Sequence, residues 1–247
     1  MKWIHVSIQI AIIFMIPLQP LCAQDTYIEV ESESLTDIDG NVYRTVKIGN
    51  QVWMAENLRV TRYRDGTKIL LATSHEDWKS DRYKSAYCFY NDDATNGALY
   101  GALYNWFALT DARKIAPKGW HVPTDDEWKE LERTLGMGED EVNRTGGQRY
   151  RGSNEGSKLA GNADLWENGA LKNDIGFGSS GFLLLPSGYR SGKSGTYSGM
   201  GKHAEYFSVT EYNNHSAWDR KMDWRVSGIG LSRNGKYHFF PVRLVRD

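Results

Sequence analysis

The residues best suited to ligand recognition are aromatic and arginine side chains in the C-terminal part of the chain. Aromatic faces stack on sugars, and Tyr, Trp and Arg supply much of the binding energy at protein interfaces. The pair Tyr189-Arg190 lies between glycines and is expected to be exposed, whereas Trp218 and Trp224 could equally pack into the core. The predicted ligand-binding residues are Tyr189, Arg190, Tyr206, Trp218, Arg220 and Trp224.

An acidic segment in the N-terminal part of the chain has the residue types of a calcium loop. Asp37, Asp39 and Asn41 are spaced like the first ligands of such a loop. However, Gly40 comes too early, and Ile48 stands at the closing position, where a calcium loop needs glutamate. Asp-Gly pairs are common in tight hairpin turns, so the segment is predicted to form a turn.

No metal, cofactor or catalytic residue is predicted from the rest of the sequence. The run 91–93 with Asn96 is typical of turns and helix caps, and His121 has no metal-ligand spacing to another histidine. Cys88 lies in an apolar stretch that predicts a buried strand, where a thiol is inert. Motifs of serine hydrolases, zinc proteases and phosphate loops are absent from the sequence. Carboxylates from distant segments could still meet in space.

Two helices are expected to help position these residues. The segment 98–112 carries apolar side chains at helical spacing along one face. Thr124 and Glu127 form a capping box at the start of a second helix, and Gly136 is a plausible end for it. Beyond this helix, more than half of the 25 glycines fall within 146–201, which predicts long irregular loops interrupted by core residues.

Tight-turn pairs predict hairpins at both ends of the domain. The pairs at 39–40 and 49–50 predict a small β-meander. The Asn-Gly pair at 234–235 predicts a final hairpin between 224–231 and 237–245. Strands are therefore expected before and after the helices.

The N-terminus has the layout of a secretory signal peptide over residues 1–23. Lys2 supplies the positive start, and the apolar run 10–16 is too short to span a bilayer. Cleavage after Ala23 is favoured over a lipid anchor at Cys22, because a lipid-attachment cysteine usually follows a small residue. We therefore expect a secreted or cell-envelope protein without a transmembrane segment.

The remaining chain is predicted to be a short tail, 24–35, followed by one domain, 36–247. The net charge of the whole chain is only −1, which argues against nucleic acid or an anionic membrane as partner. Only Cys88 remains after cleavage, so no internal disulfide is possible. Aromatic residues make up 13% of the chain and provide ample core material.

Several segments resemble the Fibrobacter succinogenes major paralogous domain family. The four specific segments are 37–43, 46–58, 100–106 and 117–128, and weaker ones are 188–190 and 241–247. The resemblance runs from about residue 36 to the last residue, and it implies secreted or surface proteins with no established activity. The same segments are more distantly similar to the formylglycine-generating and sulfatase-modifying fold. That similarity implies an α+β, C-type-lectin-like architecture of two helices, small antiparallel sheets and long irregular loops.

The chain departs from this family at two positions. Relatives often carry cysteine where this sequence has Ala116 and Leu244. Because both replacements are apolar, packing is expected to take the place of the disulfide that the resemblance implies. We therefore predict that Ala116 and Leu244 lie buried and close together.

Together these features predict an exported, non-enzymatic binding or surface module whose ligand is a glycan or an envelope protein. The alternative is a structural subunit of a cell-envelope assembly. An enzyme of the formylglycine-generating type is disfavoured, because the resemblance implies a pair of cysteines for copper and only Cys88 remains.

Overall fold

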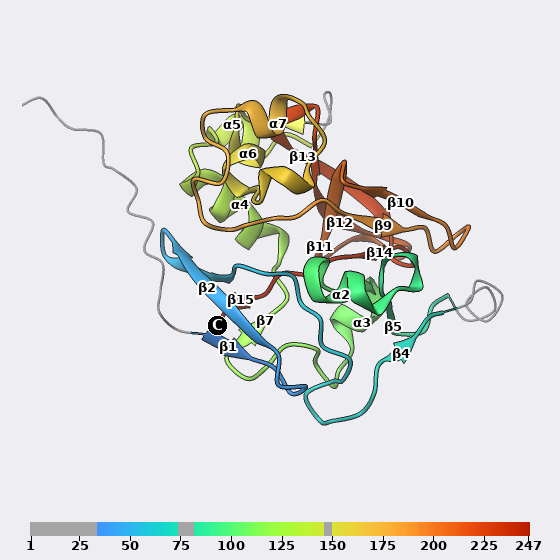
Figure 1. Cartoon of the computed structure of the whole chain (residues 1–247). Helices are drawn as coiled ribbons and strands as arrows, with labels where there is room; N and C mark the ends of the chain where they lie inside the picture. Colours follow the sequence, from blue (N-terminus) through green and yellow to red (C-terminus); the bar gives the residue numbers. More distant parts are fainter. Residues whose placement is uncertain (1–33, 74–81, 146–149) are drawn as a thin grey trace, which may run out of the picture.

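Two β-sheets form the framework of the domain. The computed structural model describes residues 34–73, 82–145 and 150–247, whose arrangement is shown in Figure 1. The predicted signal peptide, 1–23, and residues 24–33 of the predicted tail lie outside the described residues. Within the described ranges, fifteen strands form one sheet of five strands and one of ten.

The five-stranded sheet joins segments from both ends of the described chain. In spatial order its strands are β1 (Ser34–Thr36), β2 (Val42–Ile48), β3 (Gln51–Met54), β15 (Val245–Arg246) and β7 (Trp120–His121). The predicted meander is confirmed, because β1, β2 and β3 pair antiparallel and both connecting turns contain a glycine with positive φ. Leu35, which the sequence places in the tail, is buried in β1.

The segment that resembles a calcium loop is the turn between β1 and β2. Asp37 Oδ1 accepts hydrogen bonds from the backbone N–H groups of Asp39 and Asn41, each at 2.9 Å. Asp37 Oδ2 accepts a hydrogen bond from the Tyr43 hydroxyl at 2.6 Å. The carboxylate therefore holds the turn together, as the Asp-Gly pair predicts.

The ten-stranded sheet contains the longest strands. Along its main path it runs β4 (Leu70–Leu71), β5 (Ala86–Cys88), β6 (Leu103–Asn105), β14 (Phe239–Phe240), β9 (Ser187–Arg190), β11 (His203–Asn213), β12 (Ser216–Asp223), β13 (Val226–Gly235) and β8 (Tyr150–Arg151). An additional strand, β10 (Tyr197–Met200), pairs with β9. The sheet is mixed, because β4 pairs parallel with β5, and β9 pairs parallel with β11.

The helices are short. In the described ranges they are α2 (Ala94–Tyr100), α3 (Trp106–Thr110), α4 (Asp125–Thr134), α5 (Glu139–Val142), α6 (Glu155–Leu159) and α7 (Ala170–Asn173), with 3-10 turns at Tyr90–Asp92 and Ala163–Leu165. The capping box of α4 is confirmed, and Gly136 follows the helix with φ 108°. Every described helix is too short or too polar to cross a lipid bilayer.

The predicted α+β, C-type-lectin-like class with two helices and small antiparallel sheets is wrong. The fold is mostly β, with two large sheets and six short helices in the described part. Strands of two to four residues are too short to show the alternation that identifies a strand in sequence. Several of them, including β9 and β10, lie in the glycine-rich region that the sequence presents as loop.

Two predicted elements are wrong because of pairing with distant strands. The helix expected over 98–112 is divided into α2, β6 and α3, because β6 pairs with β5 and with the distant β14. The hairpin expected around 234–235 does not form. Instead, β13 continues to Gly235 and pairs with β12, while the following β14 pairs with β6 and β9.

The hydrophobic core consists of two large clusters and a smaller one. One large cluster is aromatic, with the Trp53 ring 5.1 Å from Trp128 and 5.3 Å from Phe182. The other contains both Ala116 and Leu244, which are 4% and 0% exposed. The predicted burial of these two residues is confirmed. Cys88 is buried in the small cluster as a free thiol.

We expect Leu244→Ala to reduce the free energy of unfolding by about 2–5 kcal/mol, because it leaves a cavity in this packed cluster. Leu99→Ala is the matched control, since Leu99 is 50% exposed and should change stability by less than about 1 kcal/mol. Urea unfolding followed by Trp fluorescence measures both variants. Equal losses would mean that Leu244 does not contribute as a core residue.

Candidate ligand-binding groove

The six side chains predicted from sequence do not form one surface. Arg190, Tyr206 and Arg220 are each no more than 1% exposed, and Tyr189, Trp218 and Trp224 are half-buried. The predicted exposure of Arg190 is therefore wrong. Neighbouring residues of a strand point to opposite faces of the sheet, so Arg190 is directed away from the face that Tyr189 occupies.

The buried members of the set have internal partners. The Arg190 guanidinium donates hydrogen bonds to the backbone oxygens of Ala72 and Gly195. Tyr206 donates to Asn57 Oδ1 at 3.1 Å, and its ring lies 6.1 Å from that of Trp128. These contacts hold Arg190 and Tyr206 inside the domain.

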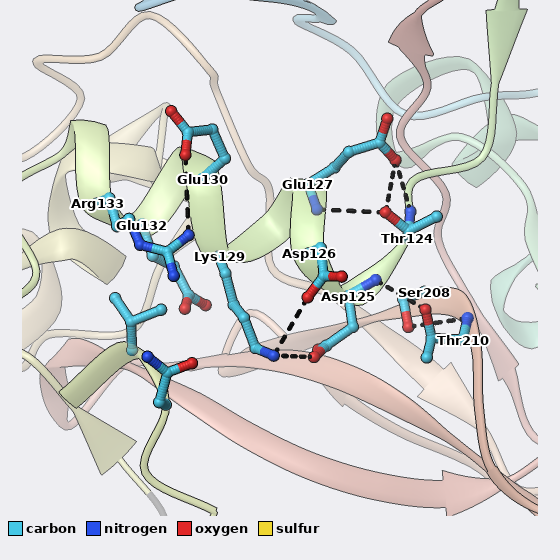
Figure 2. Close-up of polar contacts among 12 residues, drawn as sticks. Thr124, Asp125, Asp126, Glu127, Lys129, Glu130, Glu132, Arg133, Ser208 and Thr210 are labelled. Atoms are coloured by element: carbon cyan, nitrogen blue, oxygen red, sulfur yellow. Dashed lines mark hydrogen bonds and ion pairs between the residues drawn. The ribbon is translucent and has the colours of Figure 1, made fainter. Parts of the chain in front are cut away.

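Arg220 belongs to a buried ionic cluster beneath α4. Glu132, which is 0% exposed, accepts hydrogen bonds from both Arg151 and Arg220. Arg220 also donates to Asp125 Oδ1 at 2.6 Å. Figure 2 shows Asp125 and Glu132 on α4, with Lys129 bridging Asp125 and Asp126. Burial opposes the ionisation of Asp125, but the charge and hydrogen bonds of Arg220 outweigh this effect, so the pKa of Asp125 is lowered.

The opposite face of β11, β12 and β13 brings two carboxylates together from separate strands. Asn234 Nδ2 donates to Glu205 Oε2 at 3.0 Å and to Asp219 Oδ2 at 3.1 Å. Lys221 and Ser232 donate to the remaining oxygens of the pair. Burial, together with the charge of Glu205, raises the pKa of Asp219 above its ordinary value. Each carboxylate oxygen has a partner within the sheet, so this network stabilises strand pairing.

A groove of about 420 Å³ lies among segments that connect strands of the two sheets. It is bounded by the end of α3, the loop that follows it, β7, the start of α4 and one residue of β11. Its floor is apolar and is formed by Leu109, Ile115, Trp120, Val122 and Val209. Concave sites with an apolar floor and a few polar groups are the usual form of a ligand site.

His121 occupies one side of the groove, between two carboxylates. Its Nε2 lies 2.6 Å from Glu127 Oε1, and its Nδ1 lies 2.7 Å from Asp247 Oδ1. Burial alone would lower the pKa of His121, but the hydrogen bonds and charges of Asp247 and Glu127 outweigh burial, so the pKa is raised. The sequence prediction of a structural histidine agrees with these contacts.

The same carboxylate also fixes the start of α4. Glu127 Oε2 accepts hydrogen bonds from the Thr124 N–H at 2.8 Å and from its hydroxyl at 2.9 Å. Figure 2 shows the two side chains pointing toward each other at the first turn of the helix. The capping box therefore holds Thr124 and His121 in fixed positions beside the groove.

Two cations also line the groove. Arg64 is exposed and donates hydrogen bonds to the backbone oxygens of Ala116 at 2.8 Å and Pro117 at 2.9 Å. Lys114 is exposed, and it has a positive φ of 60°. Its backbone oxygen accepts a hydrogen bond from the Arg64 N–H at 2.8 Å. The loop therefore places a fixed guanidinium and an exposed ammonium next to the apolar floor.

Sequence reasoning did not identify this groove. None of the six predicted residues lines it. Lys114 and Trp120 lie in or beside a segment that resembles a family motif, and this motif carries no indication of a ligand site. The groove joins segments that are distant in the sequence: β7 pairs with β15, more than a hundred residues later in the chain, and the Val209 N–H donates to Pro123 O at 2.9 Å.

The comparisons with known proteins identify the family. No curated protein and no solved structure matches this chain. The model of the Fibrobacter succinogenes major domain matches residues 46–246, which is most of the chain and includes β7, β11 and the loop between α3 and β7. The chain therefore belongs to the Fibrobacter succinogenes major domain family.

Proposed function

We propose that this protein is an exported, non-enzymatic binding module that holds its ligand in the groove beside Trp120. The observation that carries the proposal is the combination of an open concave surface, an apolar floor and fixed polar groups at the rim. The hydrogen bonds of Arg64 and His121 order these groups before a ligand arrives, which reduces the entropy lost on binding.

The burial of Cys88, the one cysteine that follows the predicted signal peptide, supports a role in binding over formylglycine-type chemistry. Cys88 is 0% exposed, and burial raises its pKa to about 12. A thiol in such surroundings is a poor nucleophile and a poor metal ligand at neutral pH. The proposed export relies on the signal peptide that the sequence predicts.

Filling the groove should weaken ligand binding without unfolding the domain. Val209→Trp places a large side chain over the apolar floor, and because Val209 is only half-buried the fold should tolerate it. We expect wild-type protein to capture a ligand from cell-envelope extract or from a glycan array, and Val209→Trp to bind at least about tenfold more weakly. Val226→Trp is the matched control, since Val226 is half-buried on β13 and does not line the groove.

Circular dichroism establishes that both variants fold. If Val209→Trp retains wild-type binding while folded, the ligand site lies elsewhere. If neither the extract nor the array yields a ligand for wild-type protein, the binding role itself is contradicted, and a structural envelope subunit becomes the better description.

A further inference from the structure

Around the groove the carboxylates have basic partners, whereas two cations have no carboxylate partner among the described residues. The nearby carboxylates are engaged: Glu127 and Asp247 contact His121, and Asp111 pairs with Arg113 at 2.7 Å. In contrast, Lys114 has no ion-pair partner within the described residues, and the side-chain contacts of Arg64 are with backbone oxygens. The part of the groove formed by these two residues therefore carries positive charge that forms no ion pair with a described carboxylate.

The backbone at Lys114 is in a conformation that favours glycine. A φ of 60° lies in the left-handed region, which side chains other than Asn and Asp rarely adopt. The turn requires this conformation, because the Lys114 N–H donates to Asp111 O at 2.9 Å while Lys114 O accepts from Arg64 N. Glycine or asparagine would satisfy the turn with less strain, so the turn alone does not account for a lysine. Its ammonium group is the feature that a ligand could use.

The floor of the groove favours an apolar side chain over a sugar ring. Four of its five residues are aliphatic, and the most exposed of the five is the aliphatic Val209, whereas Leu109, Ile115, Val122 and the aromatic Trp120 are buried. Sugar sites usually present an aromatic face with several hydrogen-bonding groups. An aliphatic floor instead favours an apolar side chain of the ligand, because their contact removes apolar surface from water.

We propose that the groove binds an acidic peptide segment in which a carboxylate lies beside a bulky apolar residue. The carboxylate pairs with Lys114 and Arg64, and the apolar side chain covers the floor near Ile115 and Val209. This inference rests on the proposed function, because it names the ligand class of the same groove. Attraction between exposed charges is screened by salt, so binding weakens as ionic strength rises.

The test uses labelled hexapeptides that place Asp or Glu beside Leu or Phe, and matched peptides with Asn or Gln instead. Fluorescence anisotropy should show that wild-type protein binds the acidic peptides at least about tenfold more tightly than the amide peptides. Lys114→Gly should lose about tenfold in affinity for the acidic peptides, while its melting temperature stays equal or rises because glycine relieves the positive φ. Lys193→Gly, an exposed lysine in another loop, should bind like wild type.

Two results would overturn the acidic-peptide proposal. One is equal binding of acidic and amide peptides, or no binding of either set. The other is unchanged acidic-peptide affinity in folded Lys114→Gly. If Val209→Trp still abolishes capture of a glycan in that case, the groove is a ligand site of a different class. If Val209→Trp also leaves all binding unchanged, the groove itself is not the site.

Discussion

Glu132→Gln is expected to reduce the free energy of unfolding by about 3–5 kcal/mol, among the largest effects of any single substitution in this domain. The reason is the burial of two guanidinium groups around one carboxylate. Arg151 and Arg220 are 1% and 0% exposed, and both donate to Glu132. A neutral amide leaves their charges buried and only partly compensated, since Asp125 pairs with Arg220 and with Lys129 but not with Arg151.

The matched control for this prediction lies on the same helix. Glu130 is exposed and contacts Arg133 at 3.7 Å, so Glu130→Gln should cost less than about 0.5 kcal/mol. A triple variant, Glu132→Leu with Arg151→Met and Arg220→Met, should recover much of the stability that Glu132→Gln loses. Urea unfolding measures all three. Similar losses for Glu130→Gln and Glu132→Gln would show that the cluster does not behave as a buried ionic unit.

Arg243→Met is expected to cost at least about 3 kcal/mol, because it leaves several buried acceptors without a donor. Arg243 donates to Asn57 Oδ1 at 2.7 Å, to the backbone oxygens of Met54 and Phe182 at 2.9 and 2.7 Å, and to Leu183 O at 2.7 Å. It thereby connects the final segment of the chain to β3 and to the loop before β9. Burial lowers its pKa to about 10, so it remains charged at neutral pH and is held by carbonyl dipoles.

Two further variants define the role of Arg243. Arg243→Lys should also be destabilising, because an ammonium group cannot reach the four acceptors that the planar guanidinium spans. Arg233→Met should cost less than about 1 kcal/mol, since Arg233 is exposed and lies 4.2 Å over the Tyr212 ring. Thermal unfolding compares the three. A loss for Arg243→Met no larger than that for Arg233→Met would contradict the proposed clamp.

Buried arginines, including the two singled out from sequence, join segments inside the domain. Arg220 and Arg190, like Arg243, use their donors on acceptors inside the domain. A guanidinium has five donors, so it can join several chain segments at one point. In a domain with no internal disulfide between described residues, such clamps supply connections between distant segments.

Local features were predictable from the sequence. The capping box of Thr124 and Glu127 and the glycine turns at 40 and 49 depend on residues within a few positions of one another. The capping box and the turns need no knowledge of which distant segment is adjacent. The burial of Ala116 and Leu244 was instead predicted from the resemblance to the family, which the family model confirms over residues 46–246.

Tertiary structure decided the remaining features. The helix expected over 98–112 is interrupted because Tyr104 pairs with Phe240. The turn expected at Asn234 is replaced by β13, in which the side-chain amide of Asn234 donates to both Glu205 and Asp219. The side chains of Tyr189 and Arg190 point to opposite faces of the sheet because the two residues are neighbours in β9, a strand that the sequence did not reveal. The groove combines Arg64, the end of α3, β7 and Asp247, which are brought together by the pairing of β7 with β15 and by the hydrogen bonds of Arg64 to Ala116 and Pro117. Sequence periodicity records which residues are buried within one element, whereas a binding site depends on which elements become neighbours.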